Sequence, residues 1–251
     1  MKTLIHVHTD YSFDSNLSVD ALAWYAQAEG IGCVAVTDHD TIEGAMQLAR
    51  RTDIKVIIGE EISTSDGHLI GLFLKERIPP KMSARATAIA IREQGGLVLL
   101  PHPFAPAMLG GLGTIAWQIA NLIDAVEVNN AQNLWRRPDR TADRFAENMQ
   151  LLKFVGADSH SVESIAPCHQ EMADFNGPHE FLASLRLARL ARGRHPFSYF
   201  VRAAARVAMS LVGLPLPAGF GANVIPKTAG ETGRRIGGRR NDDPIHTGCL
   251  S

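Results

Sequence analysis

Short apolar runs alternate with longer amphipathic segments from the start of the chain to about residue 160. The runs lie at residues 4–7, 33–36, 55–58, 68–73, 97–100, 125–130 and 153–157, and each is typical of a buried strand. Helices are expected from Ser18 to Gly30, from Asp40 or Thr41 to Arg51, and over residues 83–94, 115–122 and 139–150. Apolar strands separated by helices predict a parallel sheet that helices cover on both sides.

Seven strands of this kind favour a closed or nearly closed barrel, although an open doubly wound sheet is compatible with the same pattern. The chain has 251 residues, of which 45% are hydrophobic, and a single core can account for this length. The predicted fold class is therefore α/β, with one barrel-like domain.

Histidines and carboxylates are concentrated where the predicted strands end. The set comprises His6, His8, Asp38, His39, Asp40, Glu61, His102, Glu127, Asp158 and His160, and His68 stands instead at the beginning of its run. In parallel α/β barrels this rim carries the active site, whereas structural polar residues would have no reason to prefer it. The i, i+2 spacing of His6 and His8 places both side chains on one face of a strand, and Asp158 and His160 repeat it. The pattern indicates a metal site.

Six short motifs follow one another along the chain. They are His6-x-His8, residues 37–41, Gly59-x-Glu61-Ile62-Ser63, residues 68–71, Pro101-His102-Pro103 and residues 156–160. Together they resemble the successive motifs of the PHP (polymerase and histidinol phosphatase) domain family over about residues 1–190. Each motif is weak alone, but six in the family's order are specific. The resemblance implies a distorted (β/α)7 barrel of the PHP type, in agreement with the seven strands.

The resemblance also implies a cluster of two to three divalent metal ions. The implied ligands are His6, His8, Glu61 and Asp158 for the first ion, Glu61 (as a bridge), His68 and His102 for the second, and Asp14, His39 and His160 for the third. Nitrogen and oxygen ligands without a thiolate suit zinc, manganese or iron rather than magnesium alone. Glu61 is assigned in preference to Glu60 because the family places this glutamate two residues after the glycine.

Several neighbouring residues receive supporting roles. Glu60 is expected to face outward or to support a ligand. Asp38 and Asp40 are expected to orient the histidine between them or to cap the next helix. Glu127 and Asn129, on the sixth strand, are expected to support ligands or to contact the substrate.

A cluster of this type hydrolyses phosphate esters, because water held between the ions loses a proton near neutral pH while the cations neutralise phosphoryl oxygens. We therefore expect a metal-dependent phosphoesterase in which Glu61 and Asp158 help to hold the metal-bound water. No Ser-His-Asp triad or reactive cysteine stands out, so no covalent intermediate is expected. The proton for the leaving group could come from metal-bound water or from a rim histidine such as His169, and the sequence does not decide between them.

The substrate is inferred from the length of one interval. Some members of the family insert a helical lid between the residues that match His68 and His102, but here a strand, a helix and the next strand fill that interval. An open rim favours nucleotides or oligonucleotide ends, with small molecules such as histidinol phosphate as the alternative. A non-catalytic metal-binding module is the alternative from another class, and the nine intact candidate ligands argue against it.

Composition adds limits on partners and compartment. The net charge is −1 and the pI is near 6.8, which gives no general attraction to nucleic acid or membranes. Cys33, Cys168 and Cys249 lack C-x-x-C spacing, so neither a disulfide framework nor a thiolate zinc site is expected. The chain opens without a charged and then apolar leader. We expect a cytoplasmic protein with no transmembrane segment and no obligate protein partner.

The barrel is expected to occupy residues 1–195 and to end in a helix over residues 178–192. A helical extension is expected at residues 196–217, with an apolar helix over residues 197–212 that carries Arg202 and Arg206. Packing on the barrel is favoured over a basic surface that meets a membrane or nucleic acid. Residues 218–251 are rich in glycine and arginine, and this composition predicts a disordered tail.

Overall fold

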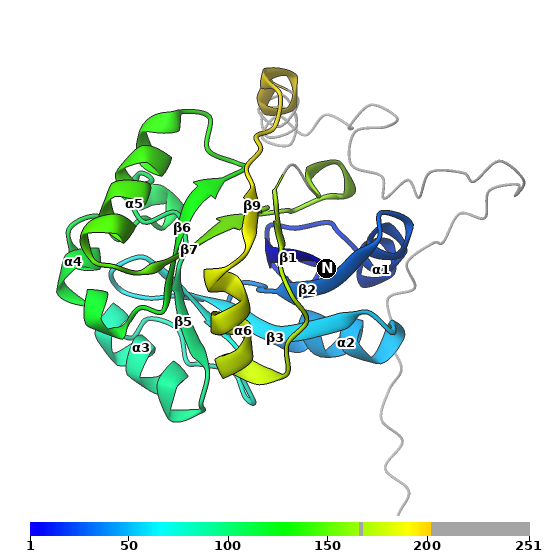
Figure 1. Ribbon diagram of the computed structural model, residues 1–251, viewed down its shortest axis with the longest axis horizontal. Helices are drawn as coiled ribbons and strands as arrows, with labels where there is room; N and C mark the ends of the chain where they lie inside the picture. Colours follow the sequence, from blue (N-terminus) through cyan, green and yellow to red (C-terminus); the bar gives the residue numbers. More distant parts are fainter. Residues whose placement is uncertain (166–167, 202–251) are drawn as a thin grey trace, which may run out of the picture.

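The computed structural model describes residues 1–165 and 168–201, and Figure 1 shows the arrangement of their helices and strands. The strands are β1 (Lys2–Val7), β2 (Ile31–Val36), β3 (Lys55–Ser63), β4 (His68–Leu72), β5 (Leu97–Leu100), β6 (Ala125–Asn130), β7 (Leu152–Gly156), β8 (His169–Glu171) and β9 (Arg189–Ala191). The α-helices are α1 (Val19–Ala28), α2 (Glu43–Arg51), α3 (Ala84–Glu93), α4 (Ile115–Gln118), α5 (Arg136–Asn148) and α6 (Gly177–Arg186). The 3-10 helices are η1 (Ala107–Leu109), η2 (Ala120–Leu122) and η3 (Val162–Ser164).

All seven predicted strands are present, and they lie side by side in one curved sheet. The strand order is β7-β6-β5-β4-β3-β2-β1-β8-β9. The prediction of an entirely parallel sheet was wrong for β4, which runs antiparallel to β3 and β5. A turn over residues 64–67, closed by a 2.9 Å hydrogen bond from Thr64 N to Gly67 O, is too short for the crossover that parallel strands require. The reversal brings His68, the first residue of β4, to the same edge as the carboxyl ends of the other strands.

The two ends of this sheet approach each other at the rim. His8 N donates to Ser159 O at 2.9 Å, and Ala157 N donates to Ile5 O at 3.1 Å. These bonds bring β1 against the end of β7 and nearly close the barrel. Away from the rim, β8 pairs antiparallel with the start of β1, and β9 pairs antiparallel with β8.

The antiparallel pair of β8 and β9, which α6 separates in the sequence, was not predicted, because each strand has only three residues. The last barrel helix, expected over residues 178–192, ends as α6 at Arg186, and residues 189–191 pair with β8 instead. Two other boundaries also differ. The N-cap of α2 is Ile42 rather than Asp40 or Thr41, and α5 begins at Arg136, three residues before the expected start at Asp139.

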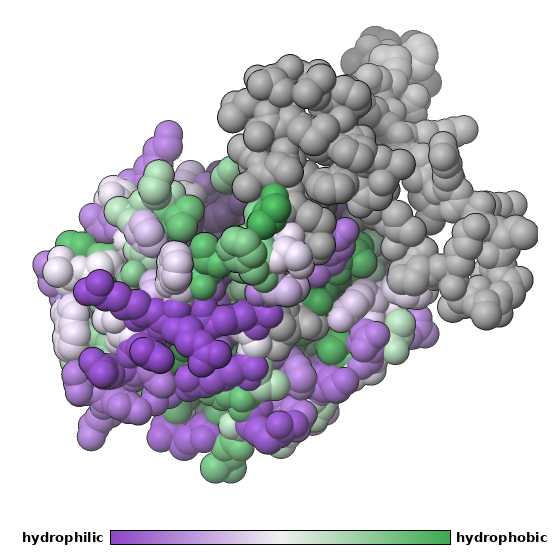
Figure 2. All heavy atoms as spheres, turned by 90° about the horizontal axis from the view of Figure 1, so that it is seen from above, coloured by the Kyte–Doolittle hydropathy of each residue, from purple (hydrophilic) through white to green (hydrophobic). Residues whose placement is uncertain are grey.

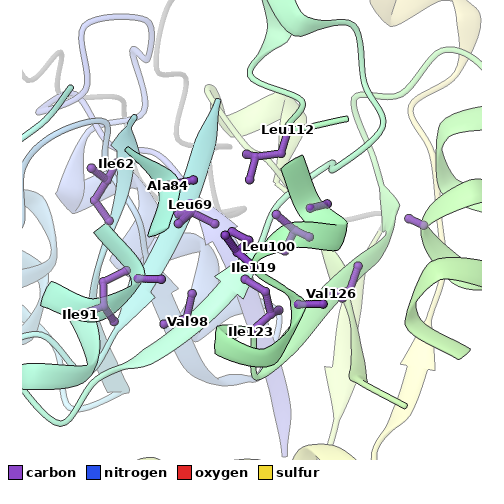
Figure 3. Packing of buried hydrophobic residues seen from close by; sticks show 14 of the residues in the cluster. Ile62, Leu69, Ala84, Ile91, Val98, Leu100, Leu112, Ile119, Ile123 and Val126 are labelled. Atoms are coloured by element: carbon purple, nitrogen blue, oxygen red, sulfur yellow. The ribbon is translucent and has the colours of Figure 1, made fainter. Parts of the chain in front are cut away.

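Apolar residues fill the barrel and also cover its outside. Inward-facing residues such as Ile57 and Leu99 pack with Phe154 and with Phe181 of α6, which closes the end of the barrel away from the rim. On the outside, α1 and α2 cover one part of the sheet, and α3, α4 and α5 cover another (Figure 1). Figure 3 shows the second of these outer clusters, in which Ile91 of α3 and Ile119 lie against Val98 and Val126 of the sheet.

Residues 197–201 are helical, which agrees with the expected start of the C-terminal helix. The rest of that predicted helix, including Arg202 and Arg206, and the glycine- and arginine-rich segment from residue 218 lie outside the described residues. Within residues 1–165 and 168–201, no helix is both long and apolar enough to cross a membrane.

We predict that Phe181→Ala lowers stability by about 3–5 kcal/mol, because it leaves a cavity in a cluster that cannot collapse easily. The Phe181 side chain is fully buried, and its ring lies 5.6 Å from that of Phe73 and 5.1 Å from that of Phe175. Chemical denaturation measures the loss. Leu187→Ala, at a side chain that is 86% exposed just beyond the same helix, is the control and should change stability by less than about 0.5 kcal/mol. Equal effects of the two substitutions would contradict this account of the barrel floor.

Candidate metal centre

Along a strand, the residues whose side chains point into the barrel (the inward row) change from apolar to polar toward the rim. On β3 this row is Ile57, Gly59 and Glu61, and on β7 it is Phe154 and Gly156, followed by Asp158. Alternation of side chains along a strand therefore places Glu61 inside the barrel and Glu60 outside it. The apolar lower part of each row packs the core, and its last residue enters the site.

His6 and His8 reach the site by a different route from the one expected. In a regular strand His6 would face the same side as Leu4, which packs against the outer helices. Instead, His6 has a left-handed backbone with φ of 67°, and the pairing of β1 with β2 shifts register between Leu4 and Val7. This irregularity turns His6 inward next to Ile5, so both imidazoles face the barrel with their ring centroids 5.2 Å apart. Such a conformation is costly outside glycine, and it is typical of functional sites.

The Glu61 carboxylate is the centre of the cluster. Its Oε2 lies 3.0 Å from His6 Nε2 and 3.1 Å from His8 Nε2. Its Oε1 lies 3.0 Å from His68 Nδ1 and 3.1 Å from His102 Nε2. Each oxygen thus faces its own pair of histidines, which is the arrangement of a carboxylate that bridges two ions.

A further group lies beside this carboxylate. Asp14 Oδ2 is 3.0 Å from His160 Nε2 and 3.4 Å from His39 Nε2. Asp158 Oδ1 is 3.5 Å from both His6 Nε2 and His8 Nε2. The structure therefore brings all nine predicted ligands together in overlapping groups of three and four, whose ligand atoms lie within 4.8 Å of one another. Their assignment to individual ions stays a prediction.

Opposite charges within the cluster compensate for burial. Burial alone would raise the pKa of the Glu61 carboxyl, but the surrounding histidines, His6 above all, hold that pKa well below its ordinary value. Burial alone would lower the pKa of His6, but Asp158, Glu61 and Glu127 raise it well above its ordinary value. Positive charge on His6 and negative charge on the carboxylates around it therefore favour each other. A divalent cation would supply that positive charge instead.

The geometry and chemistry of these side chains fit divalent transition metals. Two atoms bound to one ion at about 2.1 Å lie about 3.0–3.4 Å apart at octahedral or tetrahedral angles. The nitrogen–oxygen distances around Glu61 are 3.0 to 3.7 Å. His8 Nε2 is buried and has no hydrogen-bond partner, although it faces two carboxylates. Such a nitrogen would be expensive to bury without a bound ligand.

Glu127 lies below the cluster and holds its parts in place. Its Oε1 is 2.9 Å from His6 Nδ1, and its Oε2 accepts from His102 N at 2.7 Å and from Asn130 Nδ2 at 2.9 Å. This partner directs the Nε2 of His6 toward the site. Gly156 makes the approach possible, because a Cβ there would lie 1.5 Å from Glu127 Oε1.

The expectation that Glu127 and Asn129 contact the substrate is not supported by their placement. Both are buried, at 1% and 7% exposure, and neither lines the cleft. The pairing of β6 with β7 shifts register between them, so Asn130 rather than Asn129 shares the inward face with Glu127. Asn129 turns outward, and its Nδ2 donates to Gly193 O at 2.8 Å.

The carboxylates next to the ligands connect loops. Asp38 accepts from Thr9 N and, at 2.7 Å, from Thr9 Oγ1, and Asp40 accepts from Ser63 N at 2.8 Å. These contacts neither orient His39 directly nor cap α2, contrary to the expectation, because both carboxylates are used to join strand ends.

Glu60 faces away from the cluster and accepts from Ile78 N at 2.8 Å. Burial raises the pKa of the Glu60 carboxyl to about 7. His169, considered as a proton donor, lies in β8 beside Glu171 and does not line the cleft.

The ligands form the floor of an open cleft of about 720 Å³. Its walls include residues that sequence reasoning missed: Phe13, Met108, Leu109, Asn130, Gln132, Asn133, Tyr199 and Phe200. Phe13 follows β1 and stacks on His39, with ring centroids 5.2 Å apart. Tyr199 comes from the C-terminal segment, and its hydroxyl accepts from Gln132 Nε2 at 2.9 Å. Phe13 lies five residues after His8, and none of these wall residues belongs to one of the six motifs.

One family model and several known proteins are similar to this chain. The family model of the PHP domain matches residues 5–201. An uncharacterised protein of Methanocaldococcus jannaschii is 39% identical over 144 residues, which are 52% of this chain and 82% of that protein. A 5′-3′ exoribonuclease of Haemophilus influenzae is 29% identical over 150 residues, and the match covers 53% of this chain and 54% of the enzyme.

Solved structures show the same fold. A two-domain protein from Bacteroides vulgatus, which contains a predicted PHP-like metal-dependent phosphoesterase, superposes with a TM-score of 0.64 and 15% identity. The superposition covers 77% of this chain and 65% of that one. At this identity the match supports the fold alone.

We predict that Glu61→Gln removes most of the bound metal, whereas Glu60→Gln leaves it in place. The first substitution neutralises the carboxylate that faces both histidine pairs, and the second changes a side chain on the other face of β3. Elemental analysis of protein purified without chelator, after supplementation with manganese or zinc, should give two to three equivalents for the unaltered chain and for Glu60→Gln. Less than one equivalent in the unaltered chain, or equal loss in both variants, would contradict the assignment.

Glu60→Gln should also change how stability depends on pH. The raised pKa means that the folded state holds a proton on Glu60 between about pH 4.5 and 7 that the unfolded state has lost. Ionisation of Glu60 therefore lowers the free energy of unfolding as the pH rises through this range, by at most about 3 kcal/mol. Glutamine keeps an acceptor for Ile78 N and removes this loss. Denaturation at pH 5 and pH 8 should show the variant gaining stability relative to the unaltered chain at pH 8; a constant difference would refute the assignment.

Proposed function

The chain belongs to the PHP domain family, and from this premise we propose that it hydrolyses phosphate esters, with nucleotides or oligonucleotide ends as the favoured substrates. The observation that carries the proposal is the Glu61 carboxylate, whose two oxygens each face two histidines at the floor of an open cleft. Divalent cations held there would supply an activated water and would neutralise charge on the phosphoryl oxygens.

The chain's own residues keep the ligand atoms in position for this chemistry. Glu127 orients His6, and Asn130 Nδ2 donates to Asp158 Oδ2 at 2.9 Å, which holds that carboxylate against the floor. Ser12 Oγ lies 3.4 Å from His8 Nδ1. His6, His8 and Asp158 therefore each have a partner on the side away from the site, which is the support that a rigid metal centre needs.

The walls of the cleft favour a leaving group with a flat apolar part. Phe13 is 84% exposed, and Met108 and Leu109 of η1 are 89% and 60% exposed. Phe200 is a further aromatic residue of the wall. Apolar side chains around a polar floor are typical of ligand sites, and aromatic rings stack on nucleobases of any sequence. These walls support nucleotides over histidinol phosphate, although that phosphate ester stays the alternative substrate.

The open rim supports the same preference. Between His68 and His102 the chain forms β4, α3, β5 and their connecting loops, and no helical lid is inserted there. A nucleotide that extends beyond the floor can therefore enter from the side. The similarity to an exoribonuclease over about half of that enzyme's length is compatible with such a substrate.

We predict that the manganese- or zinc-loaded protein releases phosphate from adenosine monophosphate with a higher kcat/KM than from ribose 5-phosphate or histidinol phosphate. Phe13→Ala should reduce kcat/KM for the nucleotide about tenfold more than for ribose 5-phosphate, because only the nucleotide carries a base to stack. A colorimetric phosphate assay with matched substrates measures both.

Phe197→Ala is the control, since Phe197 is also exposed but does not line the cleft. The metal content of the Phe13 variant should equal that of the unaltered chain, which separates loss of stacking from disturbance of His39. Faster turnover of histidinol phosphate would overturn the substrate preference. Absence of hydrolysis of any phosphate ester with metal bound would favour the non-catalytic module.

A further inference from the structure

A second cavity lies on the outer side of the barrel wall, between α5 and residues 192–194. Its volume is about 420 Å³, and charged side chains dominate its lining. They are Arg136, Arg140, Arg192, Arg194, Asp139 and Asp143. Four arginines against two aspartates leave an excess of two positive charges in a chain whose net charge is −1. We call this site the arginine cavity.

Two of these arginines form ion pairs with the aspartates. Arg194 Nη2 donates to Asp139, and both Nη atoms of Arg192 donate to Asp143, at 3.2 and 3.3 Å. These pairs fix the guanidinium groups of Arg192 and Arg194 at the edge of the cavity.

The other two arginines are available for a ligand. Within the described part of the chain, Arg136 and Arg140 make no side-chain hydrogen bond or ion pair. They are four residues apart on α5, so both side chains project from one face of that helix. Two unpaired guanidinium groups on one wall form a site for an anion with several oxygens, and phosphate matches guanidinium geometry well.

The arginine cavity adjoins the metal cleft through a thin wall. Asn133 lines the cleft, and its Nδ2 donates to Asp139 at 2.6 Å. Arg194 Nη1 donates to Asn133 O at 2.7 Å. Asn130 connects the two sites a second time, because its backbone N donates to Asp139 at 3.3 Å while its side chain donates to Asp158. A single layer of side chains thus separates the cavity from the candidate ligands.

The surface around this region is strongly polar. Figure 2 shows a broad band of hydrophilic residues across the left half of the molecule, on the side where α5 lies in Figure 1. A nucleic acid that leaves the cleft in this direction would meet hydrophilic side chains rather than the apolar walls near Phe13.

We propose that the arginine cavity binds a second, non-scissile phosphate of an oligonucleotide whose terminal phosphate lies on the floor of the metal cleft. The inference rests on the proposed phosphoesterase function and names the substrate class of that site. Arg136 and Arg140 contact the phosphate oxygens, and Arg192 and Arg194 hold the edge of the site. Binding energy gained there would favour oligonucleotides over mononucleotides.

The test compares two double variants of the full-length, metal-loaded protein. Arg136→Gln/Arg140→Gln removes the two unpaired positive charges from the cavity. The control, Arg137→Gln/Arg144→Gln, removes two positive charges from the same helix at positions that do not line the cavity. Fluorescence anisotropy measures binding of a labelled single-stranded tetranucleotide with phosphorothioate linkages, which resist hydrolysis. The measurement is repeated at several salt concentrations.

The cavity pair should weaken binding about tenfold more than the control pair and should reduce the slope of log affinity against log salt by about 0.7 for each lost phosphate contact. Equal weakening by the two pairs would show only a general electrostatic attraction and would overturn the inference, as would no effect of either. A phosphoserine peptide that binds more tightly than the tetranucleotide would also overturn it. Selective loss of binding in a protein that hydrolyses no phosphate ester would retain the cavity and reject the phosphoesterase function.

Discussion

The structure of the rim depends on one buried negative charge, the Glu61 carboxylate. An isolated carboxylate at 1% exposure would cost far more free energy than this domain could supply, so positive partners must surround it. Four histidines from β1, β4 and the loop after β5 meet its two oxygens. Strands that would otherwise end independently are therefore held at one point. The same requirement explains why a transition metal, which carries more charge than a protonated imidazole, suits this position.

Irregular backbone at the strand ends makes the convergence possible. His6, His102 and Asp158 all have positive φ, at 67°, 26° and 47°, although none of them is glycine. A regular pleat would send the side chains of His6 and His102 to the outer face, with Leu4 and Leu100, and away from the site. These conformations cost free energy, and the packing of the barrel core below the rim offsets that cost. Apolar side chains fill the barrel up to the residues just before the rim. The site is thus built where the regular pattern stops.

The sequence predicted the elements better than their connections. Hydrophobic runs located all seven barrel strands, because a strand buried on both faces has a strong apolar signal. The orientation of β4 was missed, although His68 at the beginning of its run was the visible sign of it. The pair β8 and β9 could not be predicted, because strands of three residues are too short to show a pattern. The nine candidate ligands were inferred from the resemblance of the motifs, and the structure places their side chains together, although their binding of metal stays a prediction. The shift between Glu127 and Asn129 was invisible, since a bulge leaves no mark in residue types.

The arginine cavity shows why composition alone could not indicate a polyanion site. A net charge of −1 hides a local excess because Asp139 and Asp143 lie among the same arginines. The two aspartates compensate the charge of only two of the four arginines. Each is bonded to one arginine from residues 192–194 and so anchors that segment to α5. Arg136 and Arg140 keep their charge for an external partner. Segments far apart in the sequence must pack together before this asymmetry exists, so the unpaired charge is a property of the fold. The cavity that carries it is connected to the metal cleft by the hydrogen bond from Asn133 to Asp139.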